Sequence, residues 1–375
     1  MMGRRKNLND KFGFVDSMKI KDFIDYEQPN EYIVESDRYS SKYSTPVLTA
    51  GQSFILGYTN ESKGIYKKGP CIIFDDFTTS VHYVDFPFKV KSSAMKILTT
   101  KSNTDLKYCY YLLLSLSKMP PNHKRQWIST TSEKTHELPS MDKQIAIVKQ
   151  LDLISDTIAI YTKQIENFDN LVKARFIEMF GDPENNPNGW MESPLSEKLS
   201  VLGGFAFKSD KFSEISGIPI LRIGNINSGH FKPVNMVYWK EDENLERYLI
   251  YPGDLVMSLT GTVGKDDYGN VCILGDDFEK YYLNQRNAKL EIQGGINKFY
   301  LSQLLKFTQV KKKLTGISRG VRQANISNKD ILNLVVPIPP IELQQQFEDF
   351  VHQVDKSRFD IKKSITEIER EVVYD

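Results

Sequence analysis

Side chains that can bind a polyanion are densest between residues 306 and 325. Lysine ammonium groups neutralise phosphates, whereas arginine, glutamine and asparagine form paired hydrogen bonds with the edges of guanine or adenine. On the local sequence alone, the lysines are explained better as the solvated C-terminal end of a helix, where cations are favoured. The alternative prediction is contact with double-stranded DNA, made by Lys311, Lys312, Lys313, Arg319, Arg322, Gln323 and Asn325.

Three other short segments in the second half of the chain combine small or hydroxyl residues with cations and amides. Such residues at strand ends can contact phosphates and bases, but ordinary turns and edge strands use the same types, so both interpretations remain open. The DNA contacts predicted here are Arg222, Asn225, Asn227, Ser258, Thr260, Thr262, Lys265, Gln285 and Arg286. In the first half they are Lys89, Lys91, Lys124, Arg125 and Gln126.

An internal repeat indicates which elements position these side chains. Apolar residues recur at alternating intervals of four and three, and the pattern returns 200 positions later, which is typical of long helices that pack along one stripe. The first seam is Ile147, Leu151, Ile154, Ile158, Tyr161, Ile165, Phe168 and Val172. The second is Phe347, Val351, Val354, Ile361, Ile365, Ile368 and Val372. Arg358 occupies the one polar position of the second seam, and we expect its long side chain to extend into solvent.

The two seams divide the chain into four segments. Proline ahead of each seam is typical of a helix start, and Gly181 followed by Pro183 is typical of a helix end. We predict a first globular domain at 1–138, a spacer helix at 139–181, a second globular domain at 182–338 and a second spacer helix at 339–375. Strands are expected at 46–48, 71–74, 88–90, 218–223, 254–259 and 288–292, and one late helix per domain at 106–114 and 297–305.

The predicted fold class is α+β. Two globular mixed α/β domains are separated by an antiparallel pair of long coiled-coil helices and related by an internal pseudo-two-fold repeat. From Ile147 to Val172 the helix measures about 39 Å at 1.5 Å per residue, close to one turn of B-DNA at about 34–36 Å. Parallel pairing would place both domains at the same end, and the heptads alone do not exclude it.

Further segments of the chain carry a resemblance to a known family. They lie at 171–183, 186–190, 253–258 with 261–264, and 322–327 with 336–340. Through them nearly the whole chain resembles the specificity subunit of type I restriction-modification enzymes. The resemblance implies that each domain is a target-recognition domain for one half of a split DNA site. It also implies that the paired helices set the gap between the halves and dock two modification subunits, with restriction subunits as further partners. The first domain departs from the pattern because it lacks an equivalent of the loop at 261–264.

Motifs for catalysis are missing from the sequence. It contains no phosphate-binding loop, dinucleotide fingerprint or Asn/Asp-Pro-Pro-Tyr/Phe tetrapeptide. The five histidines show no metal-ligand spacing, and the three scattered cysteines favour a reducing cytosol over disulfides or zinc. The adjacent acids Asp75 and Asp76 could bind a metal, but a turn explains them more simply. We predict a non-catalytic, cytoplasmic chain without a membrane span, metal or cofactor, and the resemblance implies that S-adenosylmethionine, ATP and Mg²⁺ act on partner subunits.

Two other classes of protein remain as alternatives. A non-DNA coiled-coil adaptor would use the heptad helices to join other proteins, and its binding would lack the steep salt dependence of phosphate contacts. A free-standing DNA-modifying enzyme would need a cofactor motif that the sequence lacks. The net charge of +1 decides nothing, because a local basic surface can be balanced by acidic residues elsewhere.

Overall fold

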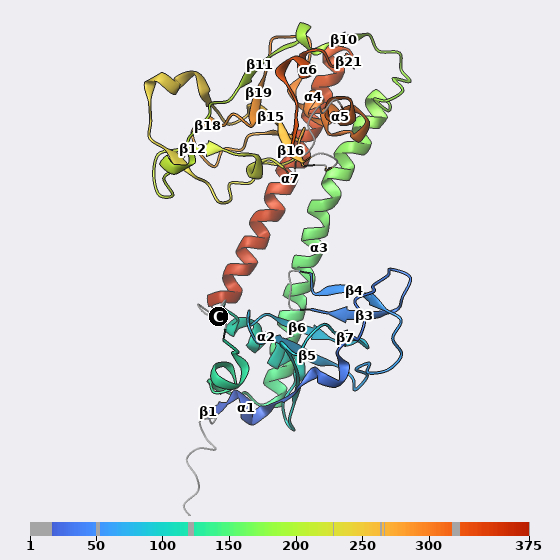
Figure 1. Ribbon diagram of the computed structural model, residues 1–375, viewed down its shortest axis with the longest axis vertical. Helices are drawn as coiled ribbons and strands as arrows, with labels where there is room; N and C mark the ends of the chain where they lie inside the picture. The colour runs from blue at the N-terminus through green and yellow to red at the C-terminus, as the bar shows by residue number, and fades with distance from the viewer. Residues whose placement is uncertain are drawn as a thin grey trace, which may run out of the picture. The chain divides into compact units, whose positions relative to one another are not determined.

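The computed structural model describes residues 17–49, 53–118, 124–227, 229–262, 265, 267–316 and 323–374, without the side chains of Gln323 and of 371–374. The chain divides into two compact units, Met1–Ala159 and Ile160–Asp375, and the division falls within the long helix α3 (Met141–Phe180). Helices and strands are mixed in each unit, which confirms the predicted α+β class (Figure 1). The heptads also predict correctly that α3 and the C-terminal α7 (Ile341–Tyr374) are long helices.

Unit 1 is built around a four-stranded antiparallel sheet in the order β2-β8-β5-β6. β5 is an inner strand because its sequence, CIIFD, is buried at every position. A second sheet, β4-β3-β7, contains one parallel pair, β3 with β7. The strands are β1 (Ser17–Lys19), β2 (Ile24–Glu27), β3 (Thr45–Leu48), β4 (Ile55–Thr59), β5 (Cys71–Asp75), β6 (Val81–Val84), β7 (Lys89–Val90), β8 (Met95–Thr100) and β9 (Thr135–Glu137). The helical elements are α1 (Ile20–Phe23), η2 (Pro29–Tyr32), α2 (Leu106–Leu116) and the π-helical turn η3 (Trp127–Thr131).

Unit 2 repeats this arrangement with a four-stranded antiparallel sheet in the order β11-β19-β15-β17. Its second sheet, β13-β12-β18-β14, again holds one parallel pair, β12 with β18. The strands are β10 (Glu192–Pro194), β11 (Leu199–Gly203), β12 (Ile218–Leu221), β13 (Tyr238–Trp239), β14 (Leu249–Ile250), β15 (Leu255–Ser258), β16 (Thr260–Thr262), β17 (Val271–Ile273), β18 (Tyr281–Leu283), β19 (Asn287–Ile292), β20 (Gln323–Asn325) and β21 (Val335–Pro337). The helical elements before α7 are η4 (Leu195–Glu197), η5 (Ser209–Lys211), η6 (Ile223–Asn225), η7 (Glu243–Tyr248), α4 (Lys298–Lys306), α5 (Thr308–Thr315) and α6 (Asn328–Leu332).

A buried glutamine fixes the start of each long helix in the same way. The Gln144 amide nitrogen donates to the Pro139 carbonyl (2.7 Å), and its oxygen accepts from the Asp105 backbone nitrogen (2.8 Å). Gln344 makes the same two bonds, to the Pro339 carbonyl (2.7 Å) and from the Asn297 backbone nitrogen (2.8 Å). Asp105 and Asn297 are themselves the N-cap residues of α2 and α4. The repeat at an offset of 200 therefore extends from the apolar pattern to individual hydrogen bonds, and each glutamine joins a long helix to its own unit.

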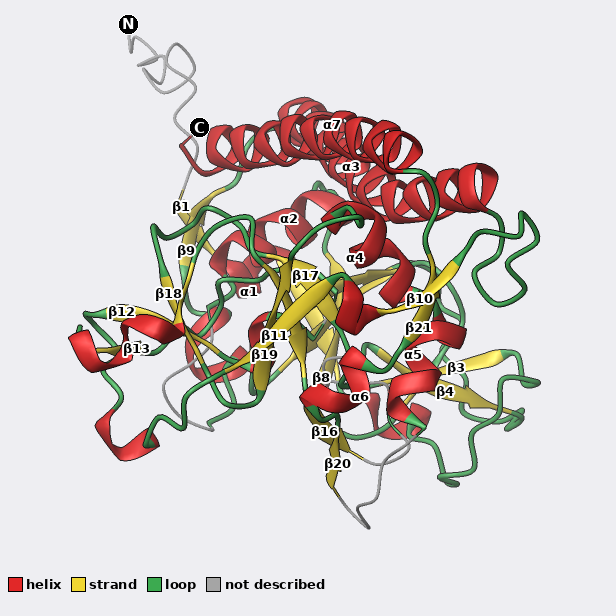
Figure 2. Ribbon diagram, turned by 90° about the horizontal axis from the view of Figure 1, so that it is seen from above, coloured by secondary structure: helices red, strands yellow, loops and turns green. Residues whose placement is uncertain are grey.

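Within unit 2, the C-terminal half of α3 packs antiparallel along α7. The rings of Phe176 and Phe180 lie 5.5 and 5.6 Å from the ring of Phe347, and Asp169 pairs with Arg358 at 2.7 Å. The contacts advance in opposite directions along the two helices, as the predicted antiparallel pairing requires. α4 lies between β17 and α7 (Figure 2). It completes a buried aromatic cluster, which consists of Phe176, Phe180, Tyr300, Phe307 and Phe347.

The expectation that Arg358 extends into solvent is wrong. Only 14% of its side chain is exposed, and its Nη2 donates to Asp169 Oδ1. Its guanidinium group also lies 5.8 Å from the centre of the Phe168 ring. The position tolerates a cation because a carboxylate on the facing helix compensates the charge, and a charge-assisted hydrogen bond offsets the cost of burial. The side chain of Val372 lies outside the described residues.

Candidate nucleic-acid interface

Predicted DNA contacts from separate segments of unit 2 meet beside the short ladder between β16 and β20. In that ladder Thr260 pairs with Asn325. The backbone of Leu259 extends the arrangement, because its nitrogen donates to the Arg286 carbonyl (2.8 Å) and its carbonyl accepts from the Ile326 nitrogen (2.8 Å). Residues that are distant in sequence are thus brought to one place, with the side chains of Arg286 and Asn325 exposed.

The three lysines of α5 divide into one structural residue and two exposed ones. Lys311 is only 7% exposed and donates to Asn270 Oδ1 (2.7 Å). The backbone nitrogen of Asn270 in turn donates to Ser258 Oγ (3.0 Å), and Ser258 is fully buried. Lys312 and Lys313 are exposed. Lys311 and Ser258 therefore attach α5 to the central sheet, whereas Lys312 and Lys313 keep the accessibility that a phosphate contact needs.

A glycine permits the close approach of α5 to this sheet. Gly269 has a φ of +68°, and a Cβ there would lie 3.1 Å from Thr315 and 3.3 Å from Ile326. The neighbouring Tyr268 hydroxyl donates to the Thr315 carbonyl at 2.8 Å. Any side chain at position 269 would meet both an unfavourable backbone conformation and a crowded space.

The loop that follows β12 is organised by a buried asparagine. Asn225 is 2% exposed; its Oδ1 accepts from the Arg222 nitrogen (2.9 Å), and its Nδ2 donates to the carbonyls of Lys232 (3.1 Å) and Val234 (3.0 Å). The Arg222 guanidinium donates to the Asn235 carbonyl. These two predicted contacts therefore shape the loop, and Asn225 has no spare donor for a base.

The same loop is joined to the β16–β20 ladder through Asp267. The Asn227 amide nitrogen, in the orientation that satisfies its neighbours, donates to the Asp267 carbonyl at 3.1 Å. The Asp267 carboxylate accepts from the Thr262 nitrogen (2.8 Å) and hydroxyl (2.9 Å). The backbone hydrogen bond from Thr262 is the main reason that the pKa of Asp267 lies below its ordinary value. Asn227 and Thr262 therefore position the ladder, and their side chains are already engaged.

The candidate interface of unit 2 is what remains accessible around the ladder. We call these residues the exposed set: Lys265, Gln285, Arg286, Lys312, Lys313 and Asn325. Arg319 and Arg322, which were also predicted to contact DNA, lie outside the described residues, as does the side chain of Gln323. The exposed set combines cations with base-reading amides, the chemistry that DNA contact requires.

In unit 1, two of the predicted contacts are already paired. Lys89 is 3% exposed; its ammonium group lies 2.7 Å from Glu61 and donates to the Lys63 carbonyl at 2.8 Å. A buried ammonium group needs such partners, which gives Lys89 a structural role in unit 1. Lys91 forms an ion pair with Asp37 at the surface.

Lys124 and Arg125 are exposed and lie just ahead of a turn that a buried carboxylate holds. Asp76 Oδ1 accepts from the backbone nitrogens of Gln126 (3.1 Å) and Trp127 (2.8 Å), and its Oδ2 pairs with Lys96 at 2.9 Å. Gln126 itself is buried. Sequence reasoning took Asp76 for part of a turn, and neither its burial nor its partner Lys96 has a local sequence signal.

A family model described as the type I restriction modification DNA specificity domain matches residues 187–370. Residues 187–370, which lie in unit 2, are therefore similar to that specificity domain. Relatives include the type I restriction enzyme EcoR124I/EcoR124II specificity subunit of Escherichia coli, 44% identical over 171 residues, or 43% of this chain and 42% of that subunit. The type I restriction enzyme MjaVIII specificity subunit of Methanocaldococcus jannaschii is 25% identical over 90% of this chain and 85% of its own length.

Solved structures share the fold over nearly the whole chain. The S subunit of the type I restriction-modification system from M. genitalium superposes with a TM-score of 0.56 at 15% identity, over 99% of this chain and 96% of that one. A chain from a study of complex assembly in the type I R-M system gives 0.51 at 15% identity, over 94% and 96%. The chain spans less than half the length of the Escherichia coli relative that it matches.

Two kinds of feature are absent from the described residues. No group of three or more histidine, cysteine, aspartate or glutamate side chains there could hold a metal ion. No helix in the same part of the chain is both long and apolar enough to cross a bilayer.

Proposed function

We propose that the chain is the sequence-specific DNA-binding subunit of a type I restriction-modification complex and reads a bipartite site. The observation that carries the proposal is the duplicated plan: two units whose antiparallel four-stranded sheets have the same strand order, each joined by a buried glutamine to a long helix. A protein with two such units can read two half-sites. Neither alternative, a coiled-coil adaptor or a free-standing DNA-modifying enzyme, has support in the fold or the family.

The proposal assigns residues 1–138 and 182–338 to target recognition and residues 139–181 and 339–375 to the spacer between the half-sites. In the second recognition domain the exposed set contacts DNA, and in the first domain Lys124 and Arg125 do so. The chain itself is non-catalytic and cytoplasmic. Methyl transfer from S-adenosylmethionine, and cleavage with ATP and Mg²⁺, then belong to partner subunits.

The outer face of α3 supports docking of protein partners. Four apolar side chains are exposed on a face turned away from the heptad seam, and Leu153 is 69% exposed. Apolar side chains left in water along one helix face are typical of a protein interface. The four are Ile145, Leu153, Ile160 and Leu171. We assign this face to two modification subunits, with restriction subunits joining that assembly.

Methylome sequencing tests the function directly. A host that carries this chain with its modification partner should methylate one asymmetric motif, composed of two constant half-sites and a gap of fixed length. The same host without this chain should lose that motif. Methylation without a bipartite motif, or methylation unaffected by deleting the chain, contradicts the proposed function.

The spacer predicts how the gap responds to helix length. One heptad is added after residue 163 of α3 and one after residue 364 of α7. These two positions lie opposite each other in the antiparallel register that Asp169 and Arg358 set. Seven residues lengthen a helix by about 10.5 Å, so the gap should grow by about three base pairs at about 3.4 Å each. Both half-sites should stay unchanged in the methylome.

A matched control inserts the heptad into α3 alone. This insertion shifts one seam against the other, and no motif with a fixed gap should be recovered. If the variant with both insertions shows an altered half-site and an unchanged gap, α3 and α7 do not set the distance between the half-sites.

A further inference from the structure

A cavity of about 790 Å³ in unit 2 lies outside the exposed set. It is lined by α3, α4, α7 and the loops on either side of β17. Its lining includes five basic side chains and two carboxylates, in a chain whose basic and acidic residues otherwise nearly balance. The five are Lys173, Lys298, Lys306, Lys311 and Arg358, and the two carboxylates are Asp169 and Asp355.

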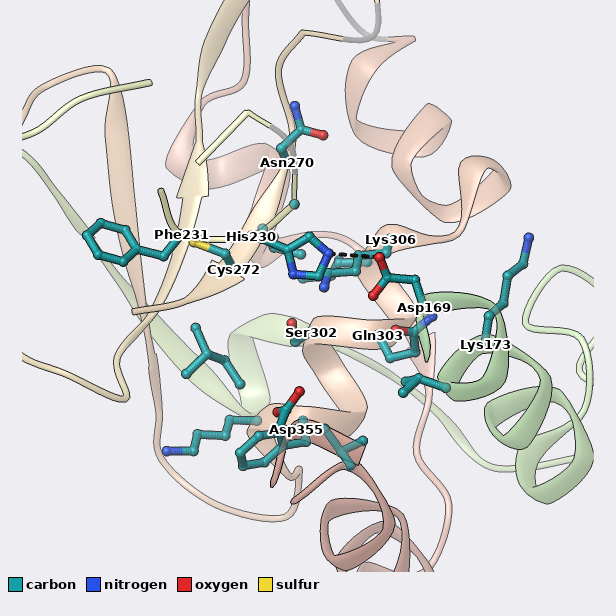
Figure 3. A pocket seen from close by; sticks show the side chains of 18 of the residues that line it. Asp169, Lys173, His230, Phe231, Asn270, Cys272, Ser302, Gln303, Lys306 and Asp355 are labelled. Atoms are coloured by element: carbon teal, nitrogen blue, oxygen red, sulfur yellow. Dashed lines mark hydrogen bonds and ion pairs between the residues drawn. The ribbon is translucent and has the colours of Figure 1, made fainter. Parts of the chain in front are cut away.

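The carboxylates leave much of this positive charge uncompensated. Asp169 accepts from Arg358 (2.7 Å) and meets the His230 ring nitrogen (3.1 Å), a contact drawn in Figure 3. Burial raises the pKa of Asp169, but these two hydrogen bonds outweigh it and hold the pKa well below the ordinary value. Asp355 lies 3.8 Å from Arg358 Nε. Both acids pair with Arg358, and their charges act on Lys306 only over a longer distance.

Two lysines of the cavity have no carboxylate within ion-pair distance in the part of the chain that the structure describes. Lys173 lies 5.5 Å from the centre of the Phe307 ring. Part of the Lys306 side chain is exposed to water. The protein atoms packed around its ammonium group lower the pKa of that group below the ordinary value. Figure 3 shows Lys306 close to His230 and Asp169, and the Lys173 side chain extending away from them. A bound anion would compensate both charges.

We infer that this cavity binds a phosphate group, held by Lys306 and by Lys173, a flexible side chain that can turn toward it. Lys311 of the cavity lining lies on α5 beside Lys312 and Lys313 of the exposed set, so the phosphate can come from the DNA backbone, a source that rests on the proposed function. It can equally come from a free polyphosphate, because a cavity of about 790 Å³ has the size of a small-molecule site.

Calorimetric titration of the full chain with inorganic pyrophosphate at low salt tests the site. The double variant K173Q/K306Q should bind about tenfold more weakly or worse, since it loses charge-assisted hydrogen bonds. Gln303→Glu, which adds a carboxylate to the cavity lining without changing its size, should also weaken binding. The control K329Q/K356Q removes the same charge from exposed positions outside the cavity and should bind like the original chain.

Competition with a DNA duplex that carries the recognised site separates the two sources. If pyrophosphate displaces DNA, and K173Q/K306Q weakens both ligands, the phosphate belongs to the DNA backbone. If pyrophosphate binds without displacing DNA, the site takes a free polyphosphate. The inference is overturned if pyrophosphate does not bind, or binds equally to K173Q/K306Q and to the control. Failure of the proposed function is different, because there the original chain would not discriminate among DNA sequences.

Discussion

Replacing Phe347 with alanine should destabilise unit 2 by about 3–5 kcal/mol. Phe347 is fully buried in the aromatic cluster, where its ring meets those of Phe176 and Phe180. The cluster joins three helices, so the cavity left by the substitution cannot close by moving one side chain. Urea titration followed by hydrogen exchange measures this loss of stability. Because the exchange is read on peptides from unit 2, unfolding of unit 2 is distinguished from unfolding of unit 1.

The matched control for this prediction lies on the same helix. Phe359 is 66% exposed, so Phe359→Ala removes the same ring without opening a cavity and should change the stability of unit 2 little. If both substitutions destabilise unit 2 equally, the aromatic cluster does not hold α7 in the way described.

Lys96→Met should destabilise unit 1 by about 3–5 kcal/mol. Lys96 and Asp76 are 0% and 1% exposed and 2.9 Å apart, so removing the cation leaves a charged carboxylate buried. Asp76 also holds the backbone of Gln126 and Trp127, so the segment with Lys124 and Arg125 should lose protection from hydrogen exchange as well. The measurement is the same titration, read on peptides of unit 1.

Two further variants separate the buried charge from loss of packing. Lys96→Met with Asp76→Asn leaves no charge buried and should recover part of the stability. Lys101→Met breaks an ion pair whose lysine is 40% exposed and should cost less than about 1 kcal/mol. A double variant no more stable than Lys96→Met would show that the buried charge is not the cause.

Elements with a local pattern were predictable from the sequence. Residues 71–74 and 288–292 were expected to be strands and lie in β5 and β19; residues 106–114 and 297–305 were expected to be helical and lie in α2 and α4. The heptads predicted α3 and α7 for the same reason, because the spacing of apolar residues reflects the period of the element that they stabilise.

Features that depend on distant partners were not predictable in the same way. Lys89 and Lys311 have the composition of DNA contacts, but both are buried, and their partners Glu61 and Asn270 are remote in sequence. Arg358 finds Asp169 only through the antiparallel register of two helices. Residue type therefore indicates which chemistry is present, whereas accessibility, which decides whether a cation meets DNA or stabilises the fold, is set by tertiary packing.

The paired glutamines have an evolutionary consequence. Gln144 and Gln344 attach each globular unit to the start of its own helix with bonds that involve no residue of the other unit. A gene segment that encodes one unit can therefore be exchanged for another with the same glutamine, without redesign of the remaining half. Under the proposed function, such an exchange would pair one half-site with a new second half-site.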